Sequence, residues 1–347
     1  MRAWTVRAAL LVMVAVAGGC RSSARTAPAG RENMKEDLAW PAPPARPRIR
    51  FVRWMSRPAD LGVERSFWRR VADFFAGADE EWLVRPTGVA ADDDRVYVAD
   101  PGGPALWILD PAAGRARRVR EATGGALASP VAVAIGPRGL VFVADSERAE
   151  VLVYDAEGAP SGTIAHAGLR RPAGLAYDAV RDRLYVADSA AHRIAVFASD
   201  GRPLGTLGRR GTGPGEFNFP THLALDRAGR LLVTDSLNFR LQVLDAEGGF
   251  QGSFGLHGDS SGEFASPKGV ALDSAGHVYV VEALFDAVQI FDRSGRYLLG
   301  FGERGVAPGH FWLPGGISID GRDRIYVADS YNRRIQVFEY LRGEGDE

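Results

Sequence analysis

The sequence predicts an all-β protein in which six repeated units each form a four-stranded antiparallel blade, with the blades arranged radially. The first observation is a repeated apolar run that ends in Val-Ala-Asp or a close variant, about fifteen residues after a proline. The prolines recur with a period of about 45 residues, which is typical of repeat proteins whose units must stack to bury their apolar faces. They are Pro86, Pro130, Pro172, Pro220, Pro267 and Pro314. The acidic residues that end the runs are Asp100, Asp145, Asp188, Asp235, Glu282 and Asp329.

The second observation is the even spacing of short strands and glycine turns inside each repeat. In the fourth repeat, residues 222–225, 231–234 and 241–244 alternate with turns, and a weaker fourth strand follows at 249–254. An Asp-x-x-Gly spacer begins several of the turns and supplies the glycine that a tight turn needs. Short strands at even spacing with such turns predict four-stranded blades placed around an axis.

The sixth repeat lacks a fourth strand, because the chain ends in a short acidic tail at residues 341–347. Residues 49–54, which precede the first repeat, form a strand-like run with no partner in their own vicinity. We predict that this N-terminal strand completes the sixth blade and closes the ring, which removes exposed sheet edges. The predicted domain therefore spans residues 49–340, with the repeats at about 85–340.

The N-terminus predicts export and a lipid anchor. Residues 1–19 have a charged start and an apolar stretch that is too short to span a bilayer, as in a signal peptide. The Ala-Gly-Gly-Cys sequence that ends at Cys20 resembles a bacterial lipobox, and Cys20 is the only cysteine of the chain. An ordinary cleaved signal with an incidental cysteine is the alternative. Arg21, rather than aspartate, follows the cysteine, which by the same resemblance indicates the outer membrane.

Residues 20–48 are rich in proline, alanine and arginine and are expected to form a tether between the membrane and the domain. An insert before the repeats carries aromatic and apolar residues at helical spacing, which predicts an amphipathic helix at about residues 65–76. The apolar face of this helix either packs on the domain or lies on a lipid surface beside Cys20.

Composition excludes some functions. The formal net charge is −1, and a nucleic-acid-binding surface of the whole-domain kind would need a basic balance. A single cysteine also rules out an intramolecular disulfide. Lys35 and Lys268 are the two lysines among 42 lysine and arginine residues, an imbalance that we attribute to genome composition.

The loops after the second strands resemble a known family. Residues 328–338 (Ala-Asp-Ser-Tyr-Asn-Arg-Arg-Ile-Gln-Val-Phe), residues 231–244 and the Gly-x-Gly-x-Gly-x-Phe linker at 211–217 are similar to NHL repeats. The resemblance covers about residues 85–340 and implies a six-bladed β-propeller. Repeats one, two and five lack the Asn-x-Arg part, so a binding surface built from this loop would be uneven around the ring.

The repeated acidic residues are expected to be structural, because an aspartate at a strand end accepts hydrogen bonds from nearby backbone N–H groups. We therefore assign Asp100, Asp145, Asp188, Asp235 and Asp329 to the repeat framework. If the resemblance holds, the loops that follow them share a face with the glycine-rich linkers. The candidate ligand or partner face comprises Arg193, Arg240, Arg334, Asn238, Asn332, His222 and Glu282. The arginines could equally clamp neighbouring blades.

Relatives of this fold include a lyase that carries zinc-ligating histidines directly after the repeat proline. The equivalent residues here are Thr87, Val131, Ala173, Thr221, Lys268 and Gly315. None is a histidine, and His222 lies one position further on, whereas zinc needs about three or four protein ligands. The sequence therefore predicts no metal ligands and no cofactor, and leaves a channel cation such as calcium open.

The sequence as a whole predicts a non-catalytic binding lipoprotein of the bacterial envelope, with a monomeric propeller domain. The expected partner is a protein, peptide or glycan, with the membrane contacted through the lipid anchor and no nucleic acid bound. The alternative is a metal-dependent hydrolase or lyase with its site in the channel.

Overall fold

The computed structural model describes residues 38–61, 82–165 and 168–342, which belong to one compact unit. The predicted signal peptide, Cys20, the helix at 65–76 and nearly all of the acidic tail lie outside these residues. The domain begins upstream of the predicted boundary at residue 49. Strand β1 (Ala39–Trp40) pairs with β2 (Ile49–Met55), and the Trp40 ring packs 5.7 Å from that of Phe301.

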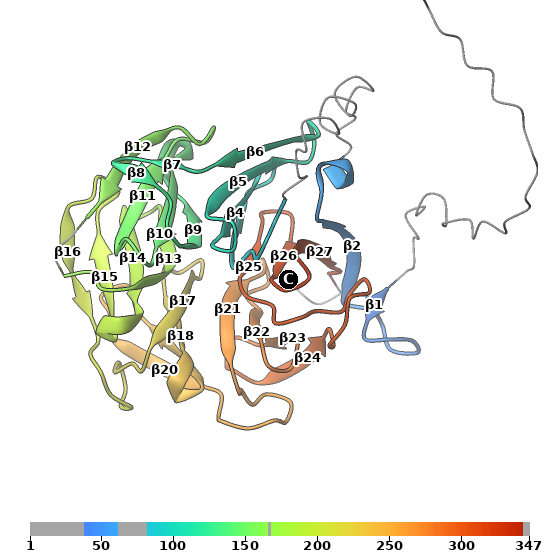
Figure 1. Ribbon diagram of the computed structural model, residues 1–347. Coiled ribbons are helices and arrows are strands. Elements are labelled where there is room, and N and C mark those ends of the chain that lie inside the picture. The colour runs from blue at the N-terminus through green and yellow to red at the C-terminus, as the bar shows by residue number, and fades with distance from the viewer. Residues whose placement is uncertain (1–37, 62–81, 166–167, 343–347) are drawn as a thin grey trace, which may run out of the picture. The chain divides into compact units, whose positions relative to one another are not determined.

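The described residues form six antiparallel blades arranged in a ring around a central axis (Figure 1), which confirms the predicted fold class. Blade 1 comprises β3 (Gly88–Ala91), β4 (Val96–Asp100), β5 (Ala105–Asp110) and β6 (Arg115–Val119). Blade 2 comprises β9 (Pro130–Ile135), β10 (Val141–Asp145), β11 (Glu150–Tyr154) and β12 (Pro160–Ile164). Blade 3 comprises β13 (Pro172–Asp178), β14 (Arg183–Asp188), β15 (Arg193–Phe197) and β16 (Pro203–Leu207).

The remaining blades continue the same pattern. Blade 4 comprises β17 (Pro220–Leu225), β18 (Leu231–Asp235), β19 (Arg240–Leu244) and β20 (Phe250–Phe254). Blade 5 comprises β21 (Pro267–Leu272), β22 (Val278–Glu282), β23 (Ala287–Phe291) and β24 (Tyr297–Phe301). Blade 6 comprises β25 (Ile317–Ile319), β26 (Arg324–Asp329), β27 (Arg334–Tyr340) and the N-terminal β2. Short elements between strands are η1 (Pro58–Leu61), the hairpin β7 (Glu121–Ala122) and β8 (Gly125–Ala126), η2 (Pro137–Gly139), η3 (Ser189–Ala191) and η4 (Ser236–Asn238).

The ring closes through the N-terminal strand, as the sequence predicts. Strand β2 pairs antiparallel with β27, with Ile49 opposite Tyr340 and Met55 opposite Ile335 (Figure 1). The innermost strands contact one another in the order β3, β9, β13, β17, β21 and β25, and β25 contacts β3 again. A ring closed in this way leaves no blade without a neighbour on either side.

The core consists of apolar layers between adjacent blades. The second strand of each blade is buried along nearly its whole length, because both of its faces pack on neighbouring blades. Tyr185 and Ala187 of blade 3, for example, pack with Leu223 and Val233 of blade 4. These layers hold the strand ends, and with them the loops of each end face, in fixed positions.

Candidate functional site

The acidic residue at the end of each second strand ties two loops to its blade. Asp100 accepts hydrogen bonds from the backbone N–H groups of Val84 and Arg85 at 2.6 and 2.9 Å, and from that of Gly102 at 3.0 Å. The first two lie just before the repeat proline, and the third lies in the turn after the strand. Asp329 similarly accepts from the N–H of Trp312 at 2.8 Å. These carboxylates are fully buried and their oxygens are occupied within the fold.

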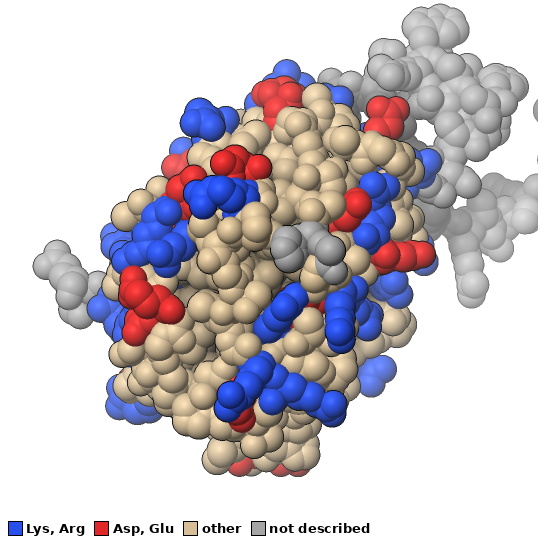
Figure 2. All heavy atoms as spheres, turned by 90° about the vertical axis from the view of Figure 1, so that its left-hand side faces the viewer, with Lys and Arg blue, Asp and Glu red and all other residues tan. Residues whose placement is uncertain are grey.

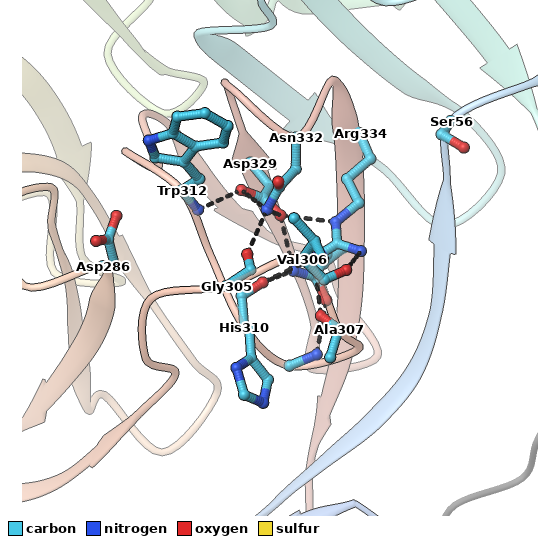
Figure 3. Close-up of polar contacts among 12 residues, drawn as sticks. Ser56, Asp286, Gly305, Val306, Ala307, His310, Trp312, Asp329, Asn332 and Arg334 are labelled. Carbon is cyan, nitrogen blue, oxygen red and sulfur yellow. Dashed lines mark hydrogen bonds and ion pairs between the residues drawn. The ribbon is translucent and has the colours of Figure 1, made fainter.

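The Asn-x-Arg-x-Gln sequence of blade 6 holds the glycine-rich linker (Figure 3). Asn332 donates to the carbonyl of Gly305 at 2.8 Å and also to Asp329. The Arg334 guanidinium donates to Asp329 at 2.7 Å and to the carbonyls of Val306, Ala307 and His310 at 2.8–2.9 Å. These contacts use the donors of Arg334 inside the protein and leave it 6% exposed. Its role in blade 6 is to fasten a loop.

Blade 4 shows the same arrangement at the equivalent positions of its own repeat. Asn238 donates to the carbonyl of Gly211 at 2.9 Å, and Arg240 donates to Asp235 at 2.9 Å and to the carbonyl of Gly213 at 2.9 Å. Gln242 adds a donor bond to the carbonyl of Glu216 at 2.7 Å. The loops and the linkers therefore share one face, as expected, and the motif side chains connect them.

Arg193, the motif arginine of blade 3, makes fewer hydrogen bonds than Arg240 and Arg334. Arg193 lies 3.7 Å from Asp188 and donates to the carbonyl of Gly168, and its buried Nε has no hydrogen-bond partner among the described residues. Blade 3 has Ala191 where blades 4 and 6 carry the asparagine. The arginines thus act mainly within their own blade and its incoming linker.

Serines after the acidic residue connect successive blades. The hydroxyl groups of Ser189, Ser236 and Ser330 donate to the carbonyls of Pro220, Pro267 and Pro86 at 2.5, 3.2 and 2.6 Å. Pro220 and Pro267 begin the innermost strand of the next blade, and Pro86 lies two residues before the innermost strand of blade 1. The aspartate of each Asp-Ser pair therefore holds loops of its own blade, and the serine connects that blade to the next one. Together they fix the positions of the loops on the end face.

Exposed apolar side chains gather on this end face over blades 4 to 6. We call this set the apolar rim; it consists of Phe219, Leu237, Leu284, Trp312 and Tyr331, which are between 36% and 61% exposed. The backbone N–H of Leu237 donates to the carbonyl of Asn218, next to Phe219, and the rings of Trp312 and Tyr331 lie 5.7 Å apart. Leu237, Leu284 and Tyr331 occupy the same position in consecutive blades, so the rim is a continuous feature of the fold.

The same face is polar over blades 1 to 3. At the position of Leu237, these blades carry Gly102, Glu147 and Ala190. Beside the repeat prolines they carry the exposed Arg85, Arg170 and Arg171, whose guanidinium groups have no hydrogen-bond partner among the described residues. The apolar rim is thus confined to blades 4 to 6, whereas exposed arginines occur on both halves of the face, including Arg210, Arg304 and Arg333 in the loops of blades 4 to 6. Along the side of the molecule shown in Figure 2, by contrast, basic and acidic side chains are interspersed.

Blades 4 and 5 place ionisable groups beside the propeller axis. Burial and, secondly, the charge of Lys268 lower the pKa of His222 to about 3. Burial lowers the pKa of Lys268, against the opposing effect of Glu282. Burial raises the pKa of Glu282, although the N–H groups of Ala265, Ser266 and Leu284 bind its carboxylate at 2.7–3.2 Å. The sequence predicts His222 and Glu282 for the candidate face, but it does not place Lys268 there.

Within the described residues, no three His, Cys, Asp or Glu side chains lie close enough to hold a metal ion. The same part of the chain contains no helix that is long and apolar enough to cross a membrane. A pocket of about 380 Å³ lies at the opposite end of blades 4 to 6, between the turns that join the first and second strands. Of its four acidic residues, Asp226, Asp273 and Asp320 are bonded within their own turns, and Asp323 is bonded to Ser274 and Arg342.

Sequence reasoning missed three contributors to this face. The buried glutamines Gln242 and Gln336 bind the linker backbone. Their signal in the sequence is that each lies two positions after a motif arginine. The apolar rim could have been found by aligning the residue two places after each acidic residue. Lys268 required the knowledge that its neighbours in space come from the adjacent blade.

Comparison with known proteins supports this architecture. The NHL repeat model matches residues 169–197 and 311–338, which lie in blades 3 and 6. No curated protein sequence matches the chain significantly. Among solved structures, a Bacteroides thetaiotaomicron protein of unknown function is similar with a TM-score of 0.60 and 18% identity, over 75% of this chain and 70% of the other.

Two further structures have different activities. A Xanthomonas campestris gluconolactonase is similar with a TM-score of 0.57 and 16% identity, over 75% of this chain and 87% of the other. An auxiliary nutrient binding protein from Bacteroides thetaiotaomicron has a TM-score of 0.60 and 12% identity, over 76% and 71%. At these identities the similarity concerns the fold alone. The repeat motifs, the blade topology and the matched residues together show a six-bladed β-propeller that contains NHL repeats in blades 3 and 6.

Proposed function

We propose that this protein is a non-catalytic binding protein of the bacterial envelope, held at the outer membrane through a lipidated Cys20. We further propose that it binds a partner protein through the end face of blades 4 to 6. The apolar rim is the observation that carries this proposal. Exposed aromatic and aliphatic side chains that lie together on a rigid surface are typical of protein-binding sites.

The chemistry of the expected partner follows from the two halves of the face. The rim is complementary to an apolar patch on the partner. The tilted rings of Trp312 and Tyr331 offer apolar area together with polar edges. The exposed guanidinium groups of Arg85, Arg170 and Arg171, which have no partner among the described residues, favour acidic side chains beside that patch. A protein with an apolar surface flanked by acidic residues matches both halves.

Site-specific photo-cross-linking in cells tests the partner surface. A photoreactive amino acid replaces Leu284 at the centre of the rim, and the same substitution at Val180 serves as the control. Val180 is 89% exposed and lies in a turn at the opposite end of blade 3. We expect a discrete cross-linked product from position 284 and none from position 180. The absence of a product at 284, or equal products at both positions, would refute the proposed surface.

The anchor is tested separately. We expect the unaltered chain to incorporate radiolabelled palmitate and to fractionate with the outer membrane. A Cys20→Ser variant should lose the label and be released from the membrane, because a lipid chain provides the binding energy of such an anchor. Incorporation of label by the Cys20→Ser variant, or release of the unaltered protein in soluble form, would disprove the lipid anchor.

A further inference from the structure

The six repeats provide an internal standard against which unusual residues can be identified. The residue after each repeat proline is half-buried beside the propeller axis, and the residue that follows it is buried against the next blade. In five blades this second residue is glycine or alanine. A Cβ at Gly88 would lie 2.7 Å from the carbonyl oxygen of Val131, and one at Gly269 would lie 2.7 Å from the backbone N of Ile317. The close approach of adjacent blades therefore requires a small residue.

The junction between blades 4 and 5 departs from this standard at four positions. His222 replaces the small residue, and Lys268 occupies a position that is neutral in the other five blades. Thr234 replaces the alanine or valine before the acidic residue, and Glu282 replaces aspartate. The Thr234 hydroxyl donates to the Lys268 carbonyl at 2.9 Å, which fixes the backbone of the lysine. Four departures at one of six equivalent junctions indicate a specialised site.

Two polar groups at this junction have unused hydrogen-bonding capacity. The Nδ1 atom of His222 is buried without a hydrogen-bond partner among the described residues, although the imidazole as a whole is partly exposed. The Lys268 ammonium likewise has no hydrogen bond or ion pair within the described part of the chain, and its side chain is half-buried. A bound group that accepts hydrogen bonds from the exposed N–H of the imidazole and from the ammonium would use this capacity and stabilise the site.

We propose that the junction of blades 4 and 5 binds a carboxylate beside the propeller axis, with Lys268 and His222 as the hydrogen-bond donors. Lys268 contributes the positive charge, and a neutral imidazole protonated on Nε2, the ring nitrogen that is not buried, contributes the second donor. Glu282 is held by three backbone N–H groups and adds negative charge nearby, which favours a monoanion over a phosphate dianion. The donors of this site are not members of the apolar rim, although the two features adjoin at Leu284, whose N–H binds Glu282. Small organic acids and the C-terminus of a peptide both present a carboxylate.

The scarcity of lysine permits a direct test. Full-length protein in detergent micelles, grown with ¹³C-lysine, gives side-chain signals from Lys35 and Lys268 alone. Acetate is titrated as the probe, with acetamide as its uncharged isostere. We expect the Lys268 signals to shift in a saturable manner, with a dissociation constant of roughly millimolar as expected for so small a ligand, and the Lys35 signals to stay unchanged. No saturable shift, an equal shift with acetamide, or tighter binding of phosphate than of acetate would overturn the proposal.

Matched variants assign the role of the imidazole. His222→Ala introduces the residue that blade 2 carries at Ala132, and we expect about threefold to tenfold weaker acetate binding from the loss of one hydrogen bond. Thr87→Val places the residue of blade 2 at the blade 1 equivalent of Lys268, and binding should be unchanged. A cooperative melt establishes that each variant is folded. Unchanged acetate binding in folded His222→Ala would contradict the role of His222.

Tighter binding of N-acetylglycine than of acetate would assign the site to peptide C-termini, and similar binding would assign it to small acids.

Discussion

At the scale of single residues, the motif that identifies the repeats is used to hold loops in place. Asp329 accepts hydrogen bonds from Arg334, Asn332, Gln336 and the backbone of Trp312. Burial raises the pKa of Asp329, and the charge of Arg334 is the largest opposing effect. A buried carboxylate with this many donors stabilises the fold only while its partners remain.

Arg334→Ala is therefore expected to destabilise the propeller. Removing the guanidinium leaves Asp329 buried without its charged partner and takes one donor from each of three linker carbonyls, of which those of Ala307 and His310 keep a second donor. We expect a loss of about 3 kcal/mol in the free energy of unfolding, measured by urea denaturation at pH 8. A loss below about 0.5 kcal/mol, which is typical of surface substitutions, would contradict this role.

The same variant should show a characteristic pH dependence. Without Arg334, the pKa of Asp329 in the folded state rises further above its unfolded value, so the folded state binds a proton more tightly than the unfolded state. Stability then falls as the pH rises through this pKa. We expect the deficit of Arg334→Ala relative to the unaltered protein to be smaller at pH 5 than at pH 8, and a deficit that grows on acidification would contradict the assignment.

At the scale of elements, the N-terminal strand β2 connects the two ends of the ring. Its pattern of burial explains how residues so distant in sequence find each other. Ile49 and Met55 are fully buried at opposite ends of the strand, in two different apolar layers, while Val52 is 45% exposed at the irregular centre of the pairing with β27. The strand thus closes the ring by filling two gaps between blades.

Ile49→Ala and Val52→Ala provide a matched pair on this strand. We expect Ile49→Ala to lower the free energy of unfolding by about 2–4 kcal/mol, because it leaves a cavity in the layer that joins blades 5 and 6. Val52→Ala should change it by less than about 0.5 kcal/mol. Equal effects of the two substitutions in urea denaturation would show that β2 does not close the ring.

At the scale of the whole molecule, the sequence is more informative about the fold than about the site. The period of the prolines and acidic residues, the turns and the strand missing from the sixth repeat were sufficient to predict six blades and the N-terminal closure. The strand β1 was missed because Ala39 and Trp40 lie in a proline-rich stretch, and only the packing of Trp40 on Phe301 and Phe338 reveals its place.

The candidate site could be predicted only in part, because the roles of its residues depend on contacts between repeats. The arginines and asparagines were correctly placed beside the linkers, but the sequence does not reveal that their donors bind linker carbonyls. The apolar rim and the junction of His222 with Lys268 arise where equivalent positions of adjacent blades meet. A single repeat contains neither feature.

Our central claim is that the repeat motif holds the fold together and the apolar rim binds the partner. The most direct test is the yield of the cross-link at position 284, measured in two further variants of the protein. One carries Leu237→Asp with Tyr331→Asp in the rim, and the other carries Arg193→Ala in the repeat motif. We expect the rim variant to melt normally but to lose the cross-linked product at least about tenfold, since burying new carboxylates at an interface is costly. Arg193→Ala should retain the product per folded molecule. Retention in the rim variant and loss in folded Arg193→Ala would contradict the account.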